Sequence, residues 1–260
     1  MVDRLTKKKP DSWLDKLKPA NSNTRISVGA RVAPKASVPL NSGSPDNLGL
    51  TSDRSRQRMV DRVRAQGVEH KAVLEALGSI ARHRFVDQAL ASRAYEDGAL
   101  PIGHGQTISQ PWVVARMLAV LCEPETPRKV LEIGTGCGYQ AAVMSKLFPQ
   151  VFTVERVRAL YDTAKARLQE MALRNVQCSF GDGMLGWSAK APFDAIIVAA
   201  AGLSIPQTLL DQLAVGGKLI APEGDTIQRL IMVTRQSAHQ WVRVELESVR
   251  FVPLKPGVQT

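Results

Sequence analysis

The thirteen residues RKVLEIGTGCGYQ, at positions 128–140, constrain the fold of this chain more than any other stretch. The segment VLEI within them is apolar apart from Glu132 and predicts a short buried strand. Three alternating glycines follow, and the run AAVMSKLF after them predicts a helix. A strand, a glycine turn and a helix in this order open a nucleotide-binding α/β unit, in which the backbone comes close to a ligand.

The spacing of these glycines narrows the class of ligand. Gly134, Gly136 and Gly138 follow a G-x-G-x-G pattern, whereas the G-x-G-x-x-G pattern cradles a pyrophosphate at a helix N-terminus. The spacing therefore favours an adenosyl ligand without a diphosphate, and we expect S-adenosylmethionine as the cofactor. Taken alone, such a turn also fits an ordinary connection between a strand and a helix.

Strands and helices alternate from the glycine turn onward. Strands are expected at 129–133, 151–154, 176–180, 194–199, 218–221, 230–235 and 241–252, the last two as an antiparallel hairpin. Helices are expected at 141–148, 157–173 and 206–213. Repeated strand–helix units predict an α/β fold with a doubly wound, mostly parallel sheet and helices on both faces. Ligands of such sheets bind outside the carboxyl ends of the strands.

The region before the sheet is expected to be helical, with one loop. Ser52 can cap a helix over 52–66, and the segment 69–80 repeats apolar residues at helical spacing. The sequence GHGQTISQP, at 103–111, is rich in glycine and polar residues and predicts a loop. A further helix is expected after Pro111.

Two acids follow the second and third predicted strands. Glu155 lies 21 residues after Gly134, where an acid can accept hydrogen bonds from a ribose diol. Asp182, between Gly181 and Gly183, can accept from an adenine amine. Each acid alone could instead serve a helix N-terminus or cap a tight turn. Together with the glycine turn, they predict a cofactor pocket at the carboxyl edge of the sheet.

S-adenosylmethionine is a methyl donor, and the residues that would bind the methyl acceptor are sought elsewhere in the sequence. A carboxylate acceptor is already anionic and needs placement and desolvation more than a general base. The chain has no Cys–His pair at useful spacing and no cluster with metal-ligand spacing, so we predict no metal site. Thr107 and Ser109 could hold a carboxylate oxygen, although Ser109 could instead cap the helix at Pro111. His104 is a further candidate in this loop, whereas His83 is expected on a surface turn.

Several motifs together resemble the protein-L-isoaspartate O-methyltransferase family over about residues 55–255. The resemblance rests on RAYEDGALPIGHGQTISQP, VLEIGTGCGYQAAV, TVER, GDG, FDAIIVAAA and RFVPL. It implies a class I, Rossmann-like, S-adenosylmethionine-dependent methyltransferase. Its members methylate the free α-carboxylate of L-isoaspartyl residues in damaged proteins, and the ester then cyclises to a succinimide.

The resemblance also implies roles for individual residues. Ser109 corresponds to the family's active-site hydroxyl, and substrate contacts are expected from Thr107, Gln110 and Val252. Cofactor contacts are expected from Ile108, Glu132, Gly134, Thr135, Gly136, Gly138, Glu155, Arg156, Gly181, Asp182 and Gly183. The sequence departs from the family pattern at Cys137, where serine is common, and in the run AAAGLSIP, where an AAAP-type sequence is expected.

Charge and composition bear on partners and location. The net charge is +10, and residues 1–50 hold nine Lys/Arg against four Asp/Glu. The rest of the charge is diffuse, and we expect neither a concentrated basic face nor base-stacking aromatics near the site, hence no nucleic-acid partner.

No apolar run approaches the roughly 20 residues of a membrane span, and no secretory signal is recognisable. We expect a cytoplasmic monomer whose three cysteines are reduced and whose partners are isoaspartyl-containing proteins and peptides.

We expect a disordered basic N-terminal tail followed by a single domain. The tail, residues 1–50, is rich in proline and polar residues and buries too little apolar surface to fold; within it, DSWLDKL at 11–17 could alternatively form a short docking helix. The domain comprises 51–260, with N-terminal helices and the substrate loop in 51–122 and the cofactor-binding sheet in 128–260.

Two other functions fit parts of the sequence. A methyltransferase acting on RNA or on a small metabolite is supported only by the basic balance of charge. A non-catalytic binding module would be expected to lack Ser109 or one of the cofactor acids, and all are present.

Overall fold

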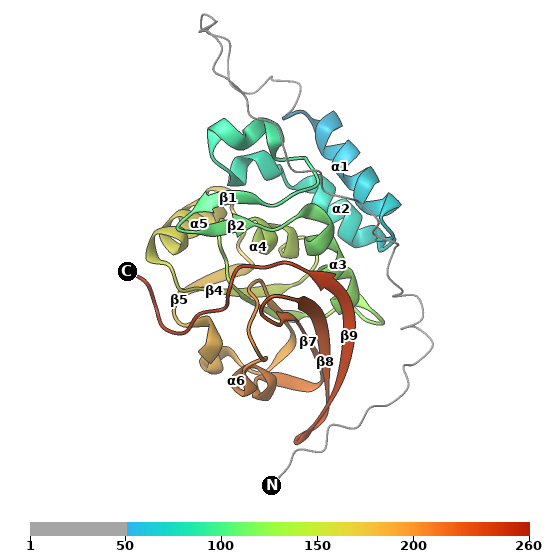
Figure 1. Ribbon diagram of the computed structural model, residues 1–260, viewed down its shortest axis with the longest axis vertical. Coiled ribbons are helices and arrows are strands. Elements are labelled where there is room, and N and C mark those ends of the chain that lie inside the picture. Colours follow the sequence, from blue (N-terminus) through green and yellow to red (C-terminus); the bar gives the residue numbers. More distant parts are fainter. Residues whose placement is uncertain (1–50) are drawn as a thin grey trace, which may run out of the picture.

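The computed structural model describes residues 51–260. The predicted disordered tail and the alternative docking helix at 11–17 lie outside the described residues. Figure 1 shows a twisted sheet at the centre, with helices packed around it and a layer of N-terminal helices above its carboxyl edge. No helix within the described range has the length and apolar character that a bilayer span requires.

The sheet has seven strands in the order β5-β4-β3-β6-β7-β8-β9. Neighbours from β5 to β7 are parallel, whereas β8 is antiparallel to both β7 and β9. The predicted doubly wound, mostly parallel sheet with a late antiparallel hairpin is therefore confirmed. The strands are β3 (Lys129–Ile133), β4 (Gln150–Glu155), β5 (Val176–Phe180), β6 (Phe193–Val198), β7 (Leu213–Glu223), β8 (Gln228–Ser237) and β9 (Gln240–Val249).

Both faces of the sheet are covered, as the near-continuous apolar strands require. On β3, Val130 belongs to one hydrophobic core and its neighbour Leu131 to the other. The first core also receives the apolar faces of most helices, and the second includes Leu209 of α6. The helices after the first two are α3 (Pro111–Cys122), α4 (Tyr139–Met144), α5 (Arg158–Glu170) and α6 (Gln207–Asp211).

The first two helices, α1 (Asp53–Ala65) and α2 (Lys71–Ser79), lie within the ranges predicted for them. The Ser52 hydroxyl accepts a hydrogen bond from the Ser55 amide and caps α1, as expected. Both helices contact α3, which in turn packs against β7. The N-terminal layer is thus connected to the sheet through α3.

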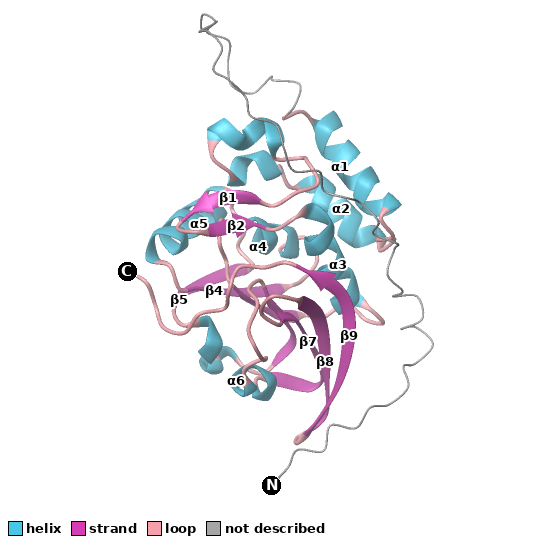
Figure 2. Ribbon diagram, in the orientation of Figure 1, coloured by secondary structure: helices cyan, strands magenta, loops and turns pink. Residues whose placement is uncertain are grey.

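The segment predicted as a loop is a β-hairpin, shown by the short arrows of Figure 2. Strands β1 (Leu100–Gly103) and β2 (Gln106–Ile108) pair antiparallel. Their two-residue turn places His104 and Gly105 at φ angles of 52° and 69°. A turn with two positive φ angles matches the right-handed twist of paired strands. The loop prediction was wrong because His-Gly is a less familiar hairpin signal than Asn-Gly.

A buried ion pair joins α3 to the edge strand β9. Arg116 Nε lies 2.6 Å from Glu247 Oε1, and the two side chains are only 8% and 9% exposed. Strand β9 ends at Val249, earlier than predicted, and the chain then runs in an extended form across the carboxyl edge of the sheet (Figure 1). This ending brings residues 252–259 beside the ends of the central strands.

Candidate functional site

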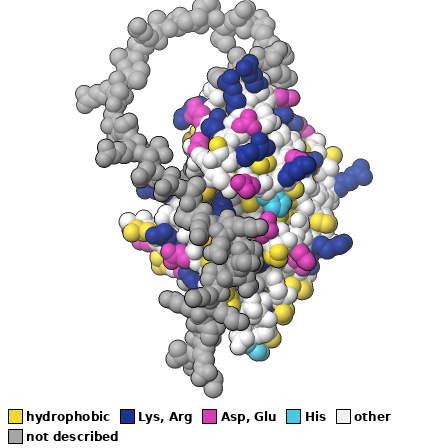
Figure 3. All heavy atoms as spheres, turned by 90° about the vertical axis from the view of Figure 1, so that its right-hand side faces the viewer, with side chains coloured by type: hydrophobic (Ala, Val, Ile, Leu, Met, Phe, Trp, Pro, Cys, Tyr) yellow, Lys and Arg dark blue, Asp and Glu magenta, His cyan; other side chains and the backbone are white. Residues whose placement is uncertain are grey.

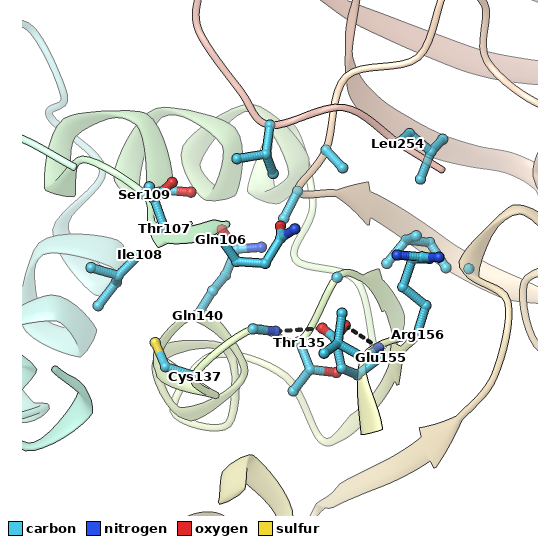
Figure 4. A pocket seen from close by; sticks show the side chains of 18 of the residues that line it. Gln106, Thr107, Ile108, Ser109, Thr135, Cys137, Gln140, Glu155, Arg156 and Leu254 are labelled. Atoms are coloured by element: carbon cyan, nitrogen blue, oxygen red, sulfur yellow. Dashed lines mark hydrogen bonds between the residues drawn. The ribbon is translucent and has the colours of Figure 1, made fainter. Parts of the chain in front are cut away.

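Two adjoining cavities lie at the carboxyl edge of the sheet, beside the end of β3. The order of the strands reverses there, because β4 lies on one side of β3 and β6 on the other. Such a switch point is where open α/β sheets bind ligands. We name them the glycine-turn cavity and the hairpin cavity. The first, shown in Figure 4, is lined by the glycine turn, the ends of β4 and β6, the hairpin and the C-terminal residues. Both cavities are lined by Thr107, Ser109, Ala199 and Val252.

The glycine turn is anchored to the neighbouring strand by its backbone. The amides of Gly134 and Thr135 both donate to the Val154 carbonyl, at 2.9 and 3.3 Å. Gly134 and Gly136 have φ angles of 92° and 55°, which favour glycine, and both line the glycine-turn cavity. The turn therefore presents backbone to a ligand, as the sequence predicted.

Gly138 has a different place from the other two glycines. It begins α4 with a φ angle of 87°, and a Cβ there would lie 3.4 Å from Ala164 of α5. It does not line the cavity. Its position serves the packing of α4 against α5, so the expected cofactor contact is not seen in this geometry.

The Glu155 carboxylate lies at the centre of the glycine-turn cavity wall. It is 4% exposed, and its two oxygens accept hydrogen bonds from the amides of Gly136 and Val157, at 2.8 and 2.9 Å. Both bonds are drawn in Figure 4. Each oxygen retains a lone pair that can accept a hydroxyl donor. Glu155 thus fixes the glycine turn and also offers an acceptor to a ligand.

Glu132 is fully buried beneath the glycine turn and does not line the cavity. Its Oε2 accepts a hydrogen bond of 2.6 Å from the Thr153 hydroxyl, which lies 2.6 Å from the Thr135 hydroxyl. Among the described residues, Glu132 Oε1 and Gln140 Nε2 fall outside hydrogen-bonding geometry, although the Gln140 side chain is close enough to Glu132 to lower the pKa of its carboxyl in part. Burial raises the pKa of Glu132 to about 8. Glu132 can therefore reach a ligand only through the residues around it.

Replacing Glu132 by glutamine is expected to remove a pH dependence of stability. The unfolded carboxyl ionises near 4.5 and the folded one near 8, so the native state binds more protons in this window and loses stability as pH rises. Urea unfolding of the ligand-free protein measures the free energy of unfolding of both proteins. From pH 5 to 8, the value for the glutamine variant should rise relative to that of the wild type by at most about 1.4 kcal/mol per pH unit. Parallel pH profiles would show that Glu132 does not titrate there.

The GDG motif contributes less to the cavity than predicted. Of its three residues only Gly183 lines the glycine-turn cavity, and a Cβ there would lie 2.5 Å from Ile133 Cγ2. The Asp182 oxygens accept hydrogen bonds from the amides of Met184 and Gly257, at 2.8 and 2.7 Å. Asp182 therefore caps a turn, the alternative that the sequence left open. Gly181 donates to the carbonyl of Glu155 and is also away from the wall.

Arg156 lines the glycine-turn cavity, but its guanidinium group points to the C-terminal residues. Nε donates to the Gly257 carbonyl at 2.9 Å, and Nη2 donates to the Pro256 carbonyl at 3.4 Å. The guanidinium group is thus engaged by the chain itself, and the expected contact of Arg156 with a cofactor stays a prediction.

Ser109 stands between the two cavities at the end of β2. It is half-buried, and within residues 51–260 its hydroxyl has no hydrogen-bond partner. The N-cap of α3 is Gln110, without a side-chain cap, so the alternative role of Ser109 as a helix cap is wrong. Gln110 lines the hairpin cavity and donates to Asp97 at 2.8 Å. The Ser109 hydroxyl is therefore available to a bound molecule.

The other predicted residues of this region divide into two groups. Ile108 is buried and lines the glycine-turn cavity, whereas His104 is exposed at the hairpin tip and lines neither cavity. His83 is half-buried rather than on an open turn, with Nδ1 2.8 Å from the Tyr95 hydroxyl. Neither histidine is brought to the site.

Sequence reasoning missed several lining residues. Two of them are aromatic, Trp112 and Phe251, and both line the hairpin cavity. The quoted motifs could have indicated some of the others, since Ala199 lies in FDAIIVAAA and Leu254 in RFVPL. Further missed residues of the glycine-turn cavity are Gln106, Cys137, Tyr139, Gln140, Ala200, Pro253 and Lys255.

Comparison with known proteins identifies the family. The family model described as protein-L-isoaspartate(D-aspartate) O-methyltransferase matches residues 54–259. The chain belongs to this family. A protein-L-isoaspartate O-methyltransferase of Bordetella parapertussis is 60% identical over 244 residues, which cover 93% of each chain. One of Burkholderia thailandensis is 49% identical over 242 residues, covering 92% of this chain and 74% of the relative.

Solved structures of protein-L-isoaspartate O-methyltransferases share the fold. One has a TM-score of 0.71 at 28% identity and covers 78% of this chain and 67% of its own. A second, described as a putative member from Plasmodium falciparum in complex with S-adenosyl-L-homocysteine, has a TM-score of 0.65 at 25% identity. It covers 77% of this chain and 98% of its own. The class I, Rossmann-like methyltransferase fold is therefore confirmed.

Proposed function

We propose that this protein transfers a methyl group from S-adenosylmethionine to the free α-carboxylate of L-isoaspartyl residues in damaged proteins. The observation that carries the proposal is the meeting of two cavities at Ser109 and Thr107. One cavity has the glycine turn and the acid of a cofactor site, and the other opens beside the Ser109 hydroxyl, which has no hydrogen-bond partner among residues 51–260. Membership of the protein-L-isoaspartate O-methyltransferase family supports this assignment.

The residues of the glycine-turn cavity fit S-adenosylmethionine. Glu155 offers acceptors for a ribose diol. Gln140 also lines the cavity, and its buried side-chain amide lies beside the Glu132 carboxyl and lowers the pKa of that carboxyl in part. The glycine spacing lacks the pyrophosphate pattern. We propose Gly134, Thr135, Gly136, Glu155, Gly183 and Ile108 as direct cofactor contacts.

Bound S-adenosylmethionine supplies an electrophilic methyl group on a sulfonium. In our proposal, the Ser109 hydroxyl donates a hydrogen bond to one oxygen of the acceptor carboxylate and turns the other oxygen towards the methyl group. Thr107 assists, and Val252 and Ile108 keep water from the reacting oxygen. No general base is required, because the acceptor is anionic at neutral pH.

Paired peptides test the proposed reaction. Purified full-length protein with methyl-labelled S-adenosylmethionine is expected to label a peptide containing isoaspartate and not its normal aspartyl twin. The two peptides have equal composition and charge, so only the position of the carboxylate differs. Equal labelling of both, or labelling of an RNA substrate in a parallel reaction, contradicts the proposal.

Replacing Ser109 by alanine is expected to lower kcat by about 10- to 100-fold, since a single hydrogen bond to a charged group contributes about 1.5–3 kcal/mol. The affinity for S-adenosylmethionine, measured by calorimetry, should stay within a factor of two. Replacing the neighbouring Thr107 by alanine provides a control with a smaller effect on kcat. A collapse of cofactor binding in the Ser109 variant would place this hydroxyl in the cofactor site instead.

The remaining expectations about partners and organisation stay proposals. We propose a cytoplasmic monomer without a nucleic-acid partner, in which residues 51–260 form one domain. Basic and acidic side chains are interspersed on the face shown in Figure 3. Helix α1 carries five arginines, but Arg56 and Arg64 pair with aspartates of the same helix.

A further inference from the structure

The C-terminal segment, residues 253–259, forms one wall of the glycine-turn cavity. It follows β9 and crosses the carboxyl edge, as the red trace leading to the C-terminus shows in Figure 1. Its first three residues line the cavity, and Leu254 is labelled there in Figure 4. Pro253 bridges Ala201 after β6, and Gln259 bridges Val157 after β4. The segment therefore spans the cavity from one side to the other.

Two residues predicted to contact the cofactor hold this segment in place. The Arg156 guanidinium donates to two carbonyls, those of Pro256 and Gly257, and the Arg156 carbonyl accepts from the Gln259 amide at 2.7 Å. The Asp182 carboxylate accepts from the Gly257 amide at 2.7 Å. The acid after β5 and the arginine after β4 thus converge on the same few residues.

The attachment is polar and open to solvent. All residues from Lys255 to Gln259 are exposed, and none belongs to either hydrophobic core. Segments held by exposed backbone hydrogen bonds open at a lower free-energy cost than core elements. Residues 255–259 can therefore detach at low cost, whereas Leu254 packs against the second hydrophobic core and its amide donates to the Ala201 carbonyl at 2.7 Å.

The segment also limits access to the cavity. The volume open to water is about 80 Å³ in the glycine-turn cavity and about 600 Å³ in the hairpin cavity. The whole empty space of the glycine-turn cavity, its opening to solvent included, is about 830 Å³. Residues 253–255 bound one side of this space, so detachment of the segment widens its opening.

We propose that Arg156 and Asp182 are positioning residues that hold the C-terminal segment as a removable wall, so that cofactor and product exchange when this wall opens. This inference rests on the proposed function, because it takes the glycine-turn cavity as the cofactor site. Arg156 and Asp182 slow the release of the cofactor because they hold residues 256–259 against the cavity. The methyl acceptor uses the hairpin cavity and is unaffected by the wall.

Gly257 allows the closed wall to be weakened without removing any contact. Its φ angle is 71°, and a Cβ added there would meet nothing within 4 Å. Alanine at this position is therefore strained only while the segment is closed. Gly216 in β7 is a matched control, with a φ angle of 84° and open space around it, and it lines neither the glycine-turn cavity nor the hairpin cavity.

The Gly257→Ala variant is expected to speed the dissociation of S-adenosylhomocysteine about five- to thirty-fold, because left-handed strain at a non-glycine residue favours opening of the segment. Stopped-flow displacement measures this rate. The KM for S-adenosylmethionine should rise while kcat stays equal or increases, a combination that a damaged fold does not produce. Gly216→Ala should leave all these quantities unchanged.

A second variant that ends at Pro256 removes the Gly257 and Gln259 contacts together and should change binding in the same direction. Unchanged dissociation in Gly257→Ala, or an equal change in Gly216→Ala, overturns the inference, whatever the truncated chain does. The binding measurement needs no methyl acceptor. Failure of isoaspartyl labelling would therefore count against the proposed function alone, whereas a wild-type protein that does not bind S-adenosylhomocysteine would count against both.

Discussion

Replacing Glu155 by alanine is expected to weaken binding of S-adenosylmethionine by about 10²- to 10⁴-fold, the largest effect on binding that we predict. Two hydrogen bonds from a ribose diol to a carboxylate contribute about 1.5–3 kcal/mol each. The substitution also frees the amides of Gly136 and Val157, which the carboxylate now holds at 2.8 and 2.9 Å. Calorimetric titration with the cofactor measures the loss.

Two further variants separate these contributions. Glu155→Gln keeps the shape of the side chain and one acceptor oxygen, so it should lose less affinity than the alanine variant. Glu170→Ala removes an exposed acid of α5 that pairs with Arg84, and it should leave cofactor affinity unchanged. An alanine variant of Glu155 that binds within threefold of the wild type would show that this carboxylate is not a cofactor ligand.

Replacing Arg116 by methionine is expected to lower the free energy of unfolding by about 3–5 kcal/mol, because it leaves the buried Glu247 carboxylate without its cation. The pair also fixes α3, which begins directly after Ser109 and Gln110, against the edge strand β9. Urea denaturation of the purified variant measures the change.

The double variant Arg116→Met/Glu247→Leu provides the informative comparison. It removes both charges, so it should recover most of the lost stability. Arg158→Met serves as a control, since its pair with Asp162 is exposed and should contribute less than about 1 kcal/mol. Equal losses of unfolding free energy in the Arg116 single variant and in the control would mean that the buried pair stabilises the fold no more than an exposed pair does.

The fold was predictable because its signals are local. Strands such as β3 are buried on both faces and read as short apolar runs, and the glycine turn marks where the first strand ends. The hairpin at 100–108 was missed because its register depends on two positive φ angles at His104 and Gly105. No periodic pattern of hydrophobicity reports such angles over strands of three or four residues.

The site was predictable only in part. Glu155 and the first two turn glycines follow directly from spacing, and they line the cavity as expected. The position of Glu132 depends on Thr153, which faces it from the adjacent strand β4 and could not be paired with it without the sheet register. The orientations of Arg156 and Asp182 depend on residues about 75–100 positions away in the sequence, near the C-terminus. Local patterns carry no information about such contacts.

The edge position of β9 has a consequence for a protein that handles damaged chains. Partly unfolded polypeptides present extended backbone, and an open, apolar strand edge pairs with it and nucleates aggregates. Among the described strands none covers the outer edge of β9. Its exposed positions include Arg243 and Glu245, which are paired across the sheet with Glu223 and Arg229. Charged side chains of this kind discourage the addition of a further strand at the edge.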